Sequence, residues 1–350
     1  MERTCRFGAG PCKSPARRGC ARCMAADCAK GLSLKAVMEL AAPHTWGASV
    51  APVAFAAAIS LAMYGRFSAP LFYSLLLTSI CLQCAVNTLN DYADFMKGVD
   101  TPENSTDPTD ASIIYNRLDP KLALCTGLGF IGLAFLCGLY ALLAAGVELA
   151  LFGAAGALIV ALYSFGKSPV SWLPIGEAVS GVAMGGVISL ACVYAFTGAL
   201  DLRVMALSVP VMLSIGLIML TNNGSDIERD RASGRRTLPA LIGRDRTLAL
   251  HAAMAAAAVA AAAAASFAYF RPGLALLPLL AAITAFPEIR IIRGGLAPEA
   301  RVASMRDVMR LHWRLSLAYS LMAASGLLSY RESEATGFMK QFAQWAGSLF

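Results

Sequence analysis

The stretch that decides the fold runs from Ala69 to Tyr92 and reads APLFYSLLLTSICLQCAVNTLNDY. It carries one formal charge, Asp91, and exceeds the roughly 20 apolar residues that a helix needs to cross a bilayer. Similar windows recur along the chain, and we therefore expect an all-α, polytopic membrane bundle of about nine transmembrane helices. The other windows are Thr45–Tyr64, Lys121–Ala144, Glu148–Phe165, Leu173–Phe196, Arg203–Asn223, Thr247–Phe270, Gly273–Ile292 and His312–Tyr330.

Composition agrees with a membrane protein, because 57% of the residues are hydrophobic and only 15% are charged. A soluble domain averages about 25% charged residues. The net charge of +7 does not indicate a nucleic-acid partner, since its distribution follows the predicted topology. When loops are assigned alternately to the two sides, 24 of the 29 Lys and Arg fall on one side.

The excess of basic residues on one side predicts the orientation. We expect a multi-pass protein of the cytoplasmic (inner) membrane, with the N-terminus in the cytoplasm and the C-terminus outside. Residues 1–34 differ from the rest, being basic and containing five of the ten Cys, and they are predicted to be a disordered tail. Cys20 and Cys23 have zinc-site spacing but lack a second pair. Residues 35–331 form the predicted membrane domain, 332–350 a short C-terminal tail, and no obligate protein partner is evident.

Polar residues gather on one face at the end of the 69–92 window. Steps of three and four residues place them on a single side of a helix. Such a row is too costly to face lipid, so it is expected to line a site or a water-filled cavity. We call this row the first acidic stripe, and it consists of Gln83, Asn87, Asn90, Asp91 and Asp94.

A second polar row ends the 203–223 window. Asn222, Asp226 and Asp230 recur every four residues, again on one helical face. We call this row the second acidic stripe. The predicted topology brings both stripes to the cytoplasmic side of the membrane, and we expect the active site there.

The side chains of the two stripes predict a magnesium-dependent site. They offer only oxygen ligands, which suit Mg²⁺ better than zinc or copper. Two acidic stripes would repel each other unless a magnesium-bound diphosphate lay between them, and a diphosphate on an allylic carbon is a leaving group. Nearby basic residues would complete its binding, and the candidates are Lys97, Lys167, Arg229, Arg235 and Arg236.

Both stripes resemble the motifs of the UbiA superfamily of membrane prenyltransferases. The nearest resemblance is to the 1,4-dihydroxy-2-naphthoate polyprenyltransferase branch of menaquinone biosynthesis. The first match reads NDYADFMKGVDT over residues 90–101, and the second reads NNGSDIERDRASGRRTL over residues 222–238. The segment from Tyr163 to Pro169 and the Gly176-Glu177 pair also fit the branch pattern.

The resemblance implies a prenyltransferase that moves a polyprenyl group from its diphosphate to a small aromatic acceptor, with loss of the acceptor carboxylate as CO₂. It implies catalytic roles for Asp91, Asp94, Asp226 and Asp230, which with Asn90 would hold Mg²⁺. The substrate-binding residues would be Gln83, Asn87, Asn90, Lys97, Asn222, Asn223, Arg229, Arg235, Arg236, Tyr163 and Lys167.

Two departures from the branch leave the acceptor open. Ser225 and His44 stand where the branch carries basic residues, so 4-hydroxybenzoate or a similar acceptor is an alternative. A cation-coupled membrane transporter is a further alternative, because the two stripes end similar spans four helices apart. The group that deprotonates the ring is also open among Glu177, Tyr163 and Tyr92.

Overall fold

The computed structural model describes residues 31–99, 111–164, 166 and 168–328. Their regular elements are helices without a β-strand, so the all-α prediction is confirmed. The predicted tails lie mostly outside the described residues, as do Asp100, Thr101 and Lys167, and the predictions for them remain untested.

The chain divides into two compact units. Unit 1 comprises Met1–Pro43 and Cys84–Ile131, and unit 2 comprises His44–Gln83 and Gly132–Phe350. Two helices, α4 (Ala69–Lys97) and α6 (Pro120–Ala145), contribute residues to both units. The first acidic stripe therefore lies mainly in unit 1 and the second in unit 2.

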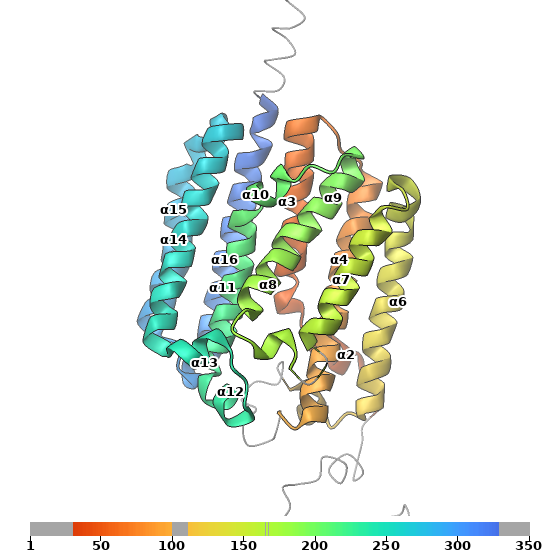
Figure 1. The fold of residues 1–350 in the computed structure, drawn as a ribbon, viewed down its shortest axis with the longest axis vertical. Coiled ribbons are helices and arrows are strands. Elements are labelled where there is room, and N and C mark those ends of the chain that lie inside the picture. Colours follow the sequence, from red (N-terminus) through yellow and green to blue (C-terminus); the bar gives the residue numbers. More distant parts are fainter. Residues whose placement is uncertain (1–30, 100–110, 165, 167, 329–350) are drawn as a thin grey trace, which may run out of the picture. The chain divides into compact units, whose positions relative to one another are not determined.

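Unit 2 is a bundle whose long helices α3, α11 and α16 lie side by side (Figure 1). Phe55 of α3 stacks on Tyr319 of α16 with ring centroids 4.9 Å apart, and the Tyr319 hydroxyl donates to the carbonyl of Leu207. The helices of this unit are α3 (Gly47–Tyr64), α7 (Leu149–Ser164), α8 (Gly176–Ser180), the π-helix η3 (Gly181–Val187), α9 (Ile188–Thr197), α10 (Arg203–Leu207), α11 (Val209–Ser225), α12 (Ile227–Ser233), α13 (Leu238–Ile242), α14 (Arg244–Tyr269), α15 (Leu277–Gly294) and α16 (Arg301–Ala324). Short 3₁₀ turns, η1 (Pro43–Thr45), η2 (Val170–Trp172), η4 (Arg271–Leu276) and η5 (Pro298–Ala300), precede or connect them.

Small residues let η3 approach α11 closely. A Cβ on Gly181 would lie 2.6 Å from the Met212 carbonyl oxygen, and one on Gly185 would lie 2.6 Å from the Met212 Cα. Close backbone contact of this kind is typical of helices that pack in lipid.

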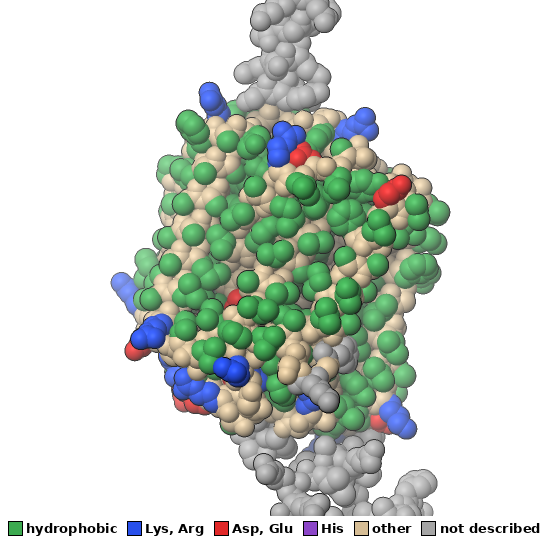
Figure 2. Space-filling model, in the orientation of Figure 1, with side chains coloured by type: hydrophobic (Ala, Val, Ile, Leu, Met, Phe, Trp, Pro, Cys, Tyr) green, Lys and Arg blue, Asp and Glu red, His purple; other side chains and the backbone are tan. Residues whose placement is uncertain are grey.

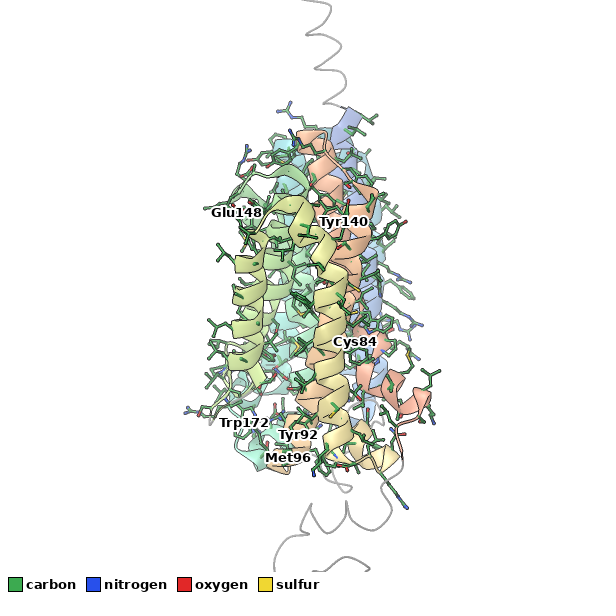
Figure 3. All side chains as sticks on the ribbon, turned by 90° about the vertical axis from the view of Figure 1, so that its right-hand side faces the viewer. Cys84, Tyr92, Met96, Tyr140, Glu148 and Trp172 are labelled. Carbon is green, nitrogen blue, oxygen red and sulfur yellow. The ribbon has the colours of Figure 1, made fainter. Side chains whose placement is uncertain are left out.

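Unit 1 is built from α2 (Leu34–Ala41), α5 (Ser112–Asn116) and the adjoining parts of α4 and α6. Its core contains Leu40, Ile113 and Leu118, which are all nearly fully buried. Figure 3 labels Cys84, Tyr92 and Met96 in order along the unit 1 part of α4. These contacts hold the end of α4, where the first acidic stripe lies.

Six helical segments in the described residues are long and apolar enough to cross a membrane. Each predicted window overlaps a helix, but α7 and α11 are only 16 and 17 residues long, and α16 carries too many charged residues to count among the six. The predicted number of nine spans is therefore not confirmed. On the face of unit 2 in Figure 2, charged side chains gather toward the ends of the helices and the band between them is mainly hydrophobic. The six segments are Gly47–Tyr64, Ala69–Lys97, Pro120–Ala145, Gly176–Thr197, Arg244–Tyr269 and Arg271–Gly294.

Two predicted boundaries differ from the structure. The Arg203–Asn223 window is divided into α10 and α11, because Pro210 lacks an N–H and favours the first turn of a new helix. Helix α16 begins at Arg301, well before the predicted His312, because charged residues interrupt the apolar run of its first turns. Arg306 and Arg310 are exposed, while Arg301 and Asp307 are buried in ion pairs. A search for apolar windows cannot detect such a helix.

Candidate functional site: the two acidic stripes

The first acidic stripe lies on the uninterrupted helix α4, where Asp91 and Asp94 are both buried. Asp91 Oδ2 accepts a hydrogen bond from the backbone N–H of Ser112, at 3.1 Å. Asn87 Nδ2 donates to the carbonyl of Ala41, at 3.1 Å. These bonds join α4 to α5 and α2, so unit 1 positions the stripe through backbone groups.

The remaining predicted residues on α4 differ in their surroundings. Asn90 is partly exposed and Lys97 is exposed at the end of the helix. Gln83 belongs to unit 2, where its amide donates to Thr45 Oγ1 at 3.3 Å and accepts from Ser49 Oγ at 3.1 Å. In the structure Gln83 therefore ties α4 to the segment that opens α3, and its predicted role in substrate binding is untested.

The second acidic stripe crosses a helix break. Helix α11 ends at Ser225 and α12 begins at Ile227, with Asp226 at the junction in a non-helical conformation. The carbonyl of Asp226 still accepts from the N–H of Asp230, at 2.8 Å. The break leaves Asp226 partly exposed, whereas Asp230 is 2% exposed.

Arg301, at the start of α16, binds two members of the second stripe at once. Its Nε donates to Asp226 Oδ1 at 3.1 Å, and its Nη2 donates to Asn222 Oδ1 at 2.8 Å. The Arg301 side chain is 7% exposed, so this pair is shielded from water. A guanidinium makes such forked contacts with a rigid geometry that lysine lacks.

Two further arginines lie beside the carboxylates of the second stripe. Arg229 Nη1 lies 3.8 Å from Asp226 Oδ2, and Arg235 Nη1 lies 3.8 Å from Asp230 Oδ1. The Arg235 guanidinium also lies over the Trp172 ring, 5.7 Å from its centroid. Ring and carboxylate together hold this cation beside the stripe. Both arginines were predicted site residues, and the structure brings them to the second stripe.

Asp230 has a neutral partner as well. Thr237 Oγ1 donates to Asp230 Oδ2 at 2.7 Å, and Thr237 is buried. The turn that makes this possible contains Gly234, whose φ of +81° is strained for other residues. The turn formed by the Gly-Arg-Arg-Thr segment, residues 234–237, thus brings Thr237 back to the carboxylate of Asp230.

Asn223 connects the stripe to another predicted group. Its Nδ2 donates to Glu177 Oε1 at 2.9 Å, and Glu177 is 5% exposed. A Cβ on the neighbouring Gly176 would lie 3.7 Å from the Tyr163 hydroxyl. Glu177 and Tyr163, both predicted as candidate bases, therefore belong to one region of unit 2.

Arg236 is placed differently from the other predicted cations. Its side chain is exposed, while its backbone N–H donates to the Trp172 carbonyl at 2.8 Å. Reasoning from sequence omitted Arg301, Thr237 and Trp172. Thr237 was inside the matched motif, but Arg301 is 75 positions from Asp226 and no local pattern connects them.

The residues present suit a hard cation bound together with a phosphate. The stripes supply carboxylate and amide oxygens, which are the ligands that Mg²⁺ prefers, and the arginines suit phosphate oxygens. Among the described residues there is no group of three or more His, Cys, Asp or Glu arranged to hold a metal ion. The donor chemistry therefore fits magnesium that takes part of its coordination from a substrate.

Comparison with known families identifies the chain. The sequence model of the UbiA prenyltransferase family matches residues 49–310, well over half of the chain. The chain belongs to the UbiA prenyltransferase family. As a UbiA protein with several long apolar helices, it is an integral membrane protein. The family predicted from the two stripes and the all-α membrane fold predicted from the apolar windows are confirmed.

Relatives in the UbiA family extend from bacteria to animals. The chain is 34% identical over 215 residues to the 1,4-dihydroxy-2-naphthoate octaprenyltransferase of Bacillus subtilis, covering 61% of this chain and 68% of the relative. It is 28% identical over 207 residues to the human UbiA prenyltransferase domain-containing protein 1, covering 57% of this chain and 59% of the relative. The chain thus spans less than two thirds of the human relative.

Solved structures of UbiA homologues share the fold. A homologue from Archaeoglobus fulgidus bound to GPP and Mg²⁺ has a TM-score of 0.55 at 17% identity, covering 81% of this chain and 99% of that chain. An apo homologue from Aeropyrum pernix K1 has a TM-score of 0.57 at 20% identity, covering 81% and 98%. At these identities the likeness concerns the fold alone.

Proposed function

We propose that this UbiA-family protein transfers a polyprenyl group from its diphosphate to 1,4-dihydroxy-2-naphthoate, as in menaquinone biosynthesis. The observation that carries the proposal is the second acidic stripe, where Asp226 lies between Arg229 and Arg301 and Asp230 lies beside Arg235. Alternating carboxylates and guanidiniums can bind a magnesium-bound diphosphate through both its metal and its free oxygens. The Bacillus subtilis relative, named for this acceptor, supports the choice of ring.

Asn90, Asp91, Asp94, Asp226 and Asp230 are the residues that would hold the magnesium diphosphate. Bound magnesium would lower the charge of the leaving diphosphate. Arg229, Arg235 and Arg301 would bind its remaining oxygens, each already held by a carboxylate of the second stripe. Preorganised cations of this kind stabilise charge that develops during bond breaking.

In the proposed reaction the bond between the allylic carbon and the diphosphate oxygen breaks, and the diphosphate leaves with the electron pair. The electron-rich ring carbon then forms a bond with the allylic carbon. Loss of the acceptor carboxylate as CO₂ returns its electron pair to the ring. With an acceptor that carries hydrogen at this position, a proton is lost instead, and Glu177 is a buried carboxylate connected to the stripe through Asn223.

The decisive experiment incubates membranes containing the protein with a polyprenyl diphosphate, Mg²⁺ and single candidate acceptors. We expect 1,4-dihydroxy-2-naphthoate to yield a prenylated product that has lost the carboxylate mass, and EDTA to abolish its formation. If only 4-hydroxybenzoate yields a product, the proposed prenyl transfer stands but the proposed acceptor, 1,4-dihydroxy-2-naphthoate, is wrong. Absence of diphosphate release with every acceptor would favour the cation-transporter alternative.

We also propose that the second stripe opens to the cytoplasm, as the distribution of basic residues predicts. The same topology places the C-terminus outside the cytoplasm. An ordinary fluorescent reporter fused after residue 328 should then stay dark, whereas a reporter that can fold after export should fluoresce. Cytoplasmic maturation of an ordinary reporter at this position would reverse the orientation.

A further inference from the structure

The outer side of α16 carries a row of arginines that the proposed reaction does not use. Arg306, Arg310 and Arg314 follow one another every four residues, so they lie on one helical face and span about 12 Å along the axis. Sequence reasoning assigned these residues to a loop or the edge of a span, but the structure places them inside the helix Arg301–Ala324. Figure 3 shows long nitrogen-tipped side chains projecting outward in this region of unit 2.

Helix α15 completes this surface. Arg290 Nε and Arg310 Nη1 each donate to a different oxygen of the buried Asp307, both at 3.0 Å. The guanidiniums of Arg290 and Arg314 also lie over the Phe286 ring, 6.0 and 5.9 Å from its centroid. Arg290, Arg310 and Arg314 are therefore ordered by a shared carboxylate and a shared ring. Together with Arg306, on the same face of α16, they form one cluster, here called the arginine stripe.

The arginine stripe has more positive than negative charge. Asp307 is one carboxylate for two guanidiniums, and within the described part of the chain Arg306 and Arg314 have no carboxylate partner. The side chains of Arg290 and Arg310 are 44% and 46% exposed, so the excess charge is open to a partner. An anionic group fits this surface.

The surroundings of the arginine stripe are apolar. Exposed hydrophobic side chains flank it on α15 and continue along α16 beyond Arg314. Arg290 lies four residues before the end of α15, about 6 Å along the axis, where a long side chain reaches the polar margin of a bilayer. The flanking residues are Phe286, Ile289, Val302, Trp313, Leu317 and Leu321.

We propose that the arginine stripe binds the phosphate of an anionic phospholipid, whose acyl chains lie along the apolar side of α16. Arginine is expensive on a lipid-facing helix unless its charge is neutralised or reaches the interface, and a lipid phosphate does both. A second copy of the chain fits less well, because symmetric contact through this face would bring arginines against arginines. A free anion has no acyl chain, so it would not contact the exposed apolar side chains that flank the arginines.

The test compares lipid binding of the purified full-length protein in nanodiscs made of mixed phosphatidylglycerol and phosphatidylcholine. We expect the native protein to enrich phosphatidylglycerol around itself, measured by mass spectrometry of lipids retained after extraction into mild detergent. The double variant Arg310→Gln/Arg314→Gln should lower this enrichment by about 10- to 30-fold, given the contribution of each basic residue near a lipid surface. Arg310→Lys/Arg314→Lys should keep most of the enrichment.

A matched control removes exposed arginines elsewhere in unit 2, with Arg246→Gln/Arg271→Gln, and should leave the enrichment unchanged. Size-exclusion profile and thermal unfolding of each variant show whether it is folded. Equal retention of both lipids by native protein, or unchanged enrichment in the folded glutamine variant, overturns the proposal. The proposal is also overturned if glycerol phosphate displaces phosphatidylglycerol as well as the whole lipid does, which indicates a site for a free anion. A native dimer that the glutamine variant dissociates on size exclusion would indicate a second copy of the chain instead.

Discussion

The two acidic stripes have similar residues but are built differently. The first lies within one uninterrupted helix, α4, whereas the second crosses the break between α11 and α12 at Asp226. In the first, a peptide N–H from Ser112 binds Asp91. In the second, the guanidinium of Arg301 binds Asp226 together with Asn222.

This difference shows that a carboxylate in an apolar protein can be positioned by a neutral dipole or by a full charge. A peptide N–H orients a carboxylate and leaves its charge in place. A guanidinium orients it and also balances the charge, which suits a stripe that binds diphosphate in our proposal. The following changes test that contrast, in order of decreasing expected effect.

Removing a carboxylate from either stripe should have the largest effect. We expect Asp226→Asn and Asp94→Asn each to lower prenyl transfer by about 10²- to 10³-fold, because each removes a charge proposed to hold the magnesium diphosphate. Initial rates at saturating Mg²⁺ in membranes with matched protein content measure this. Near-native turnover in either folded variant would remove that stripe from the site.

Removing the charge that balances the second stripe should come next. Arg301→Gln is expected to raise the KM for the prenyl diphosphate by about 10- to 100-fold, since charge-assisted hydrogen bonds contribute about 1.5–3 kcal/mol each. Arg301→Lys should fall in between, because lysine cannot make the forked contact with Asp226 and Asn222. Arg246→Gln, an exposed arginine away from the stripe, is the control, and an equal effect there would contradict the role of Arg301.

Removing the dipole that orients the first stripe should have a smaller effect. Ser112→Pro deletes the N–H that binds Asp91, at the first position of α5, where proline is tolerated. We expect about a tenfold loss of turnover, as for a single hydrogen bond. Ser112→Ala keeps the N–H and should retain most of the activity, so equal losses in the two variants would point to the side chain instead.

The smallest effect should come from Glu228, which follows Asp226 by two residues but is exposed. Its hydrogen bonds with Arg244 hold the pKa of this carboxyl below its usual 4.5. The stabilisation is therefore present at neutral pH and is lost as the pH falls below this value. Glu228→Gln should leave turnover unchanged and lower thermal stability slightly at pH 7, with the difference from native protein shrinking as the pH falls below 4.5. A large loss of activity in this variant would contradict the prediction and place Glu228 among the functional residues of the second stripe.

Sequence alone was sufficient for the helical class, the continuous helix of the first acidic stripe and the family, whereas the prediction that the second stripe lies on one uninterrupted helical face was wrong. These features depend on local patterns, since apolar runs predict helices in lipid and steps of three and four residues place polar groups on one face. The arginines within the second motif, Arg229 and Arg235, were also within reach of such reasoning. Their spacing from Asp226 and Asp230 is short enough to read from the chain.

Only the tertiary structure revealed which distant groups complete the second stripe. Arg301 reaches Asp226 because α16 packs against α11, and Trp172 lies under Arg235 because the chain returns there after α7. The interruption at Asp226 and the early start of α16 likewise depend on packing between helices. Hydrophobic periodicity shows which face of each helix is apolar and which is polar. The pairing of charges between helices, in contrast, depends on how the helices pack in three dimensions.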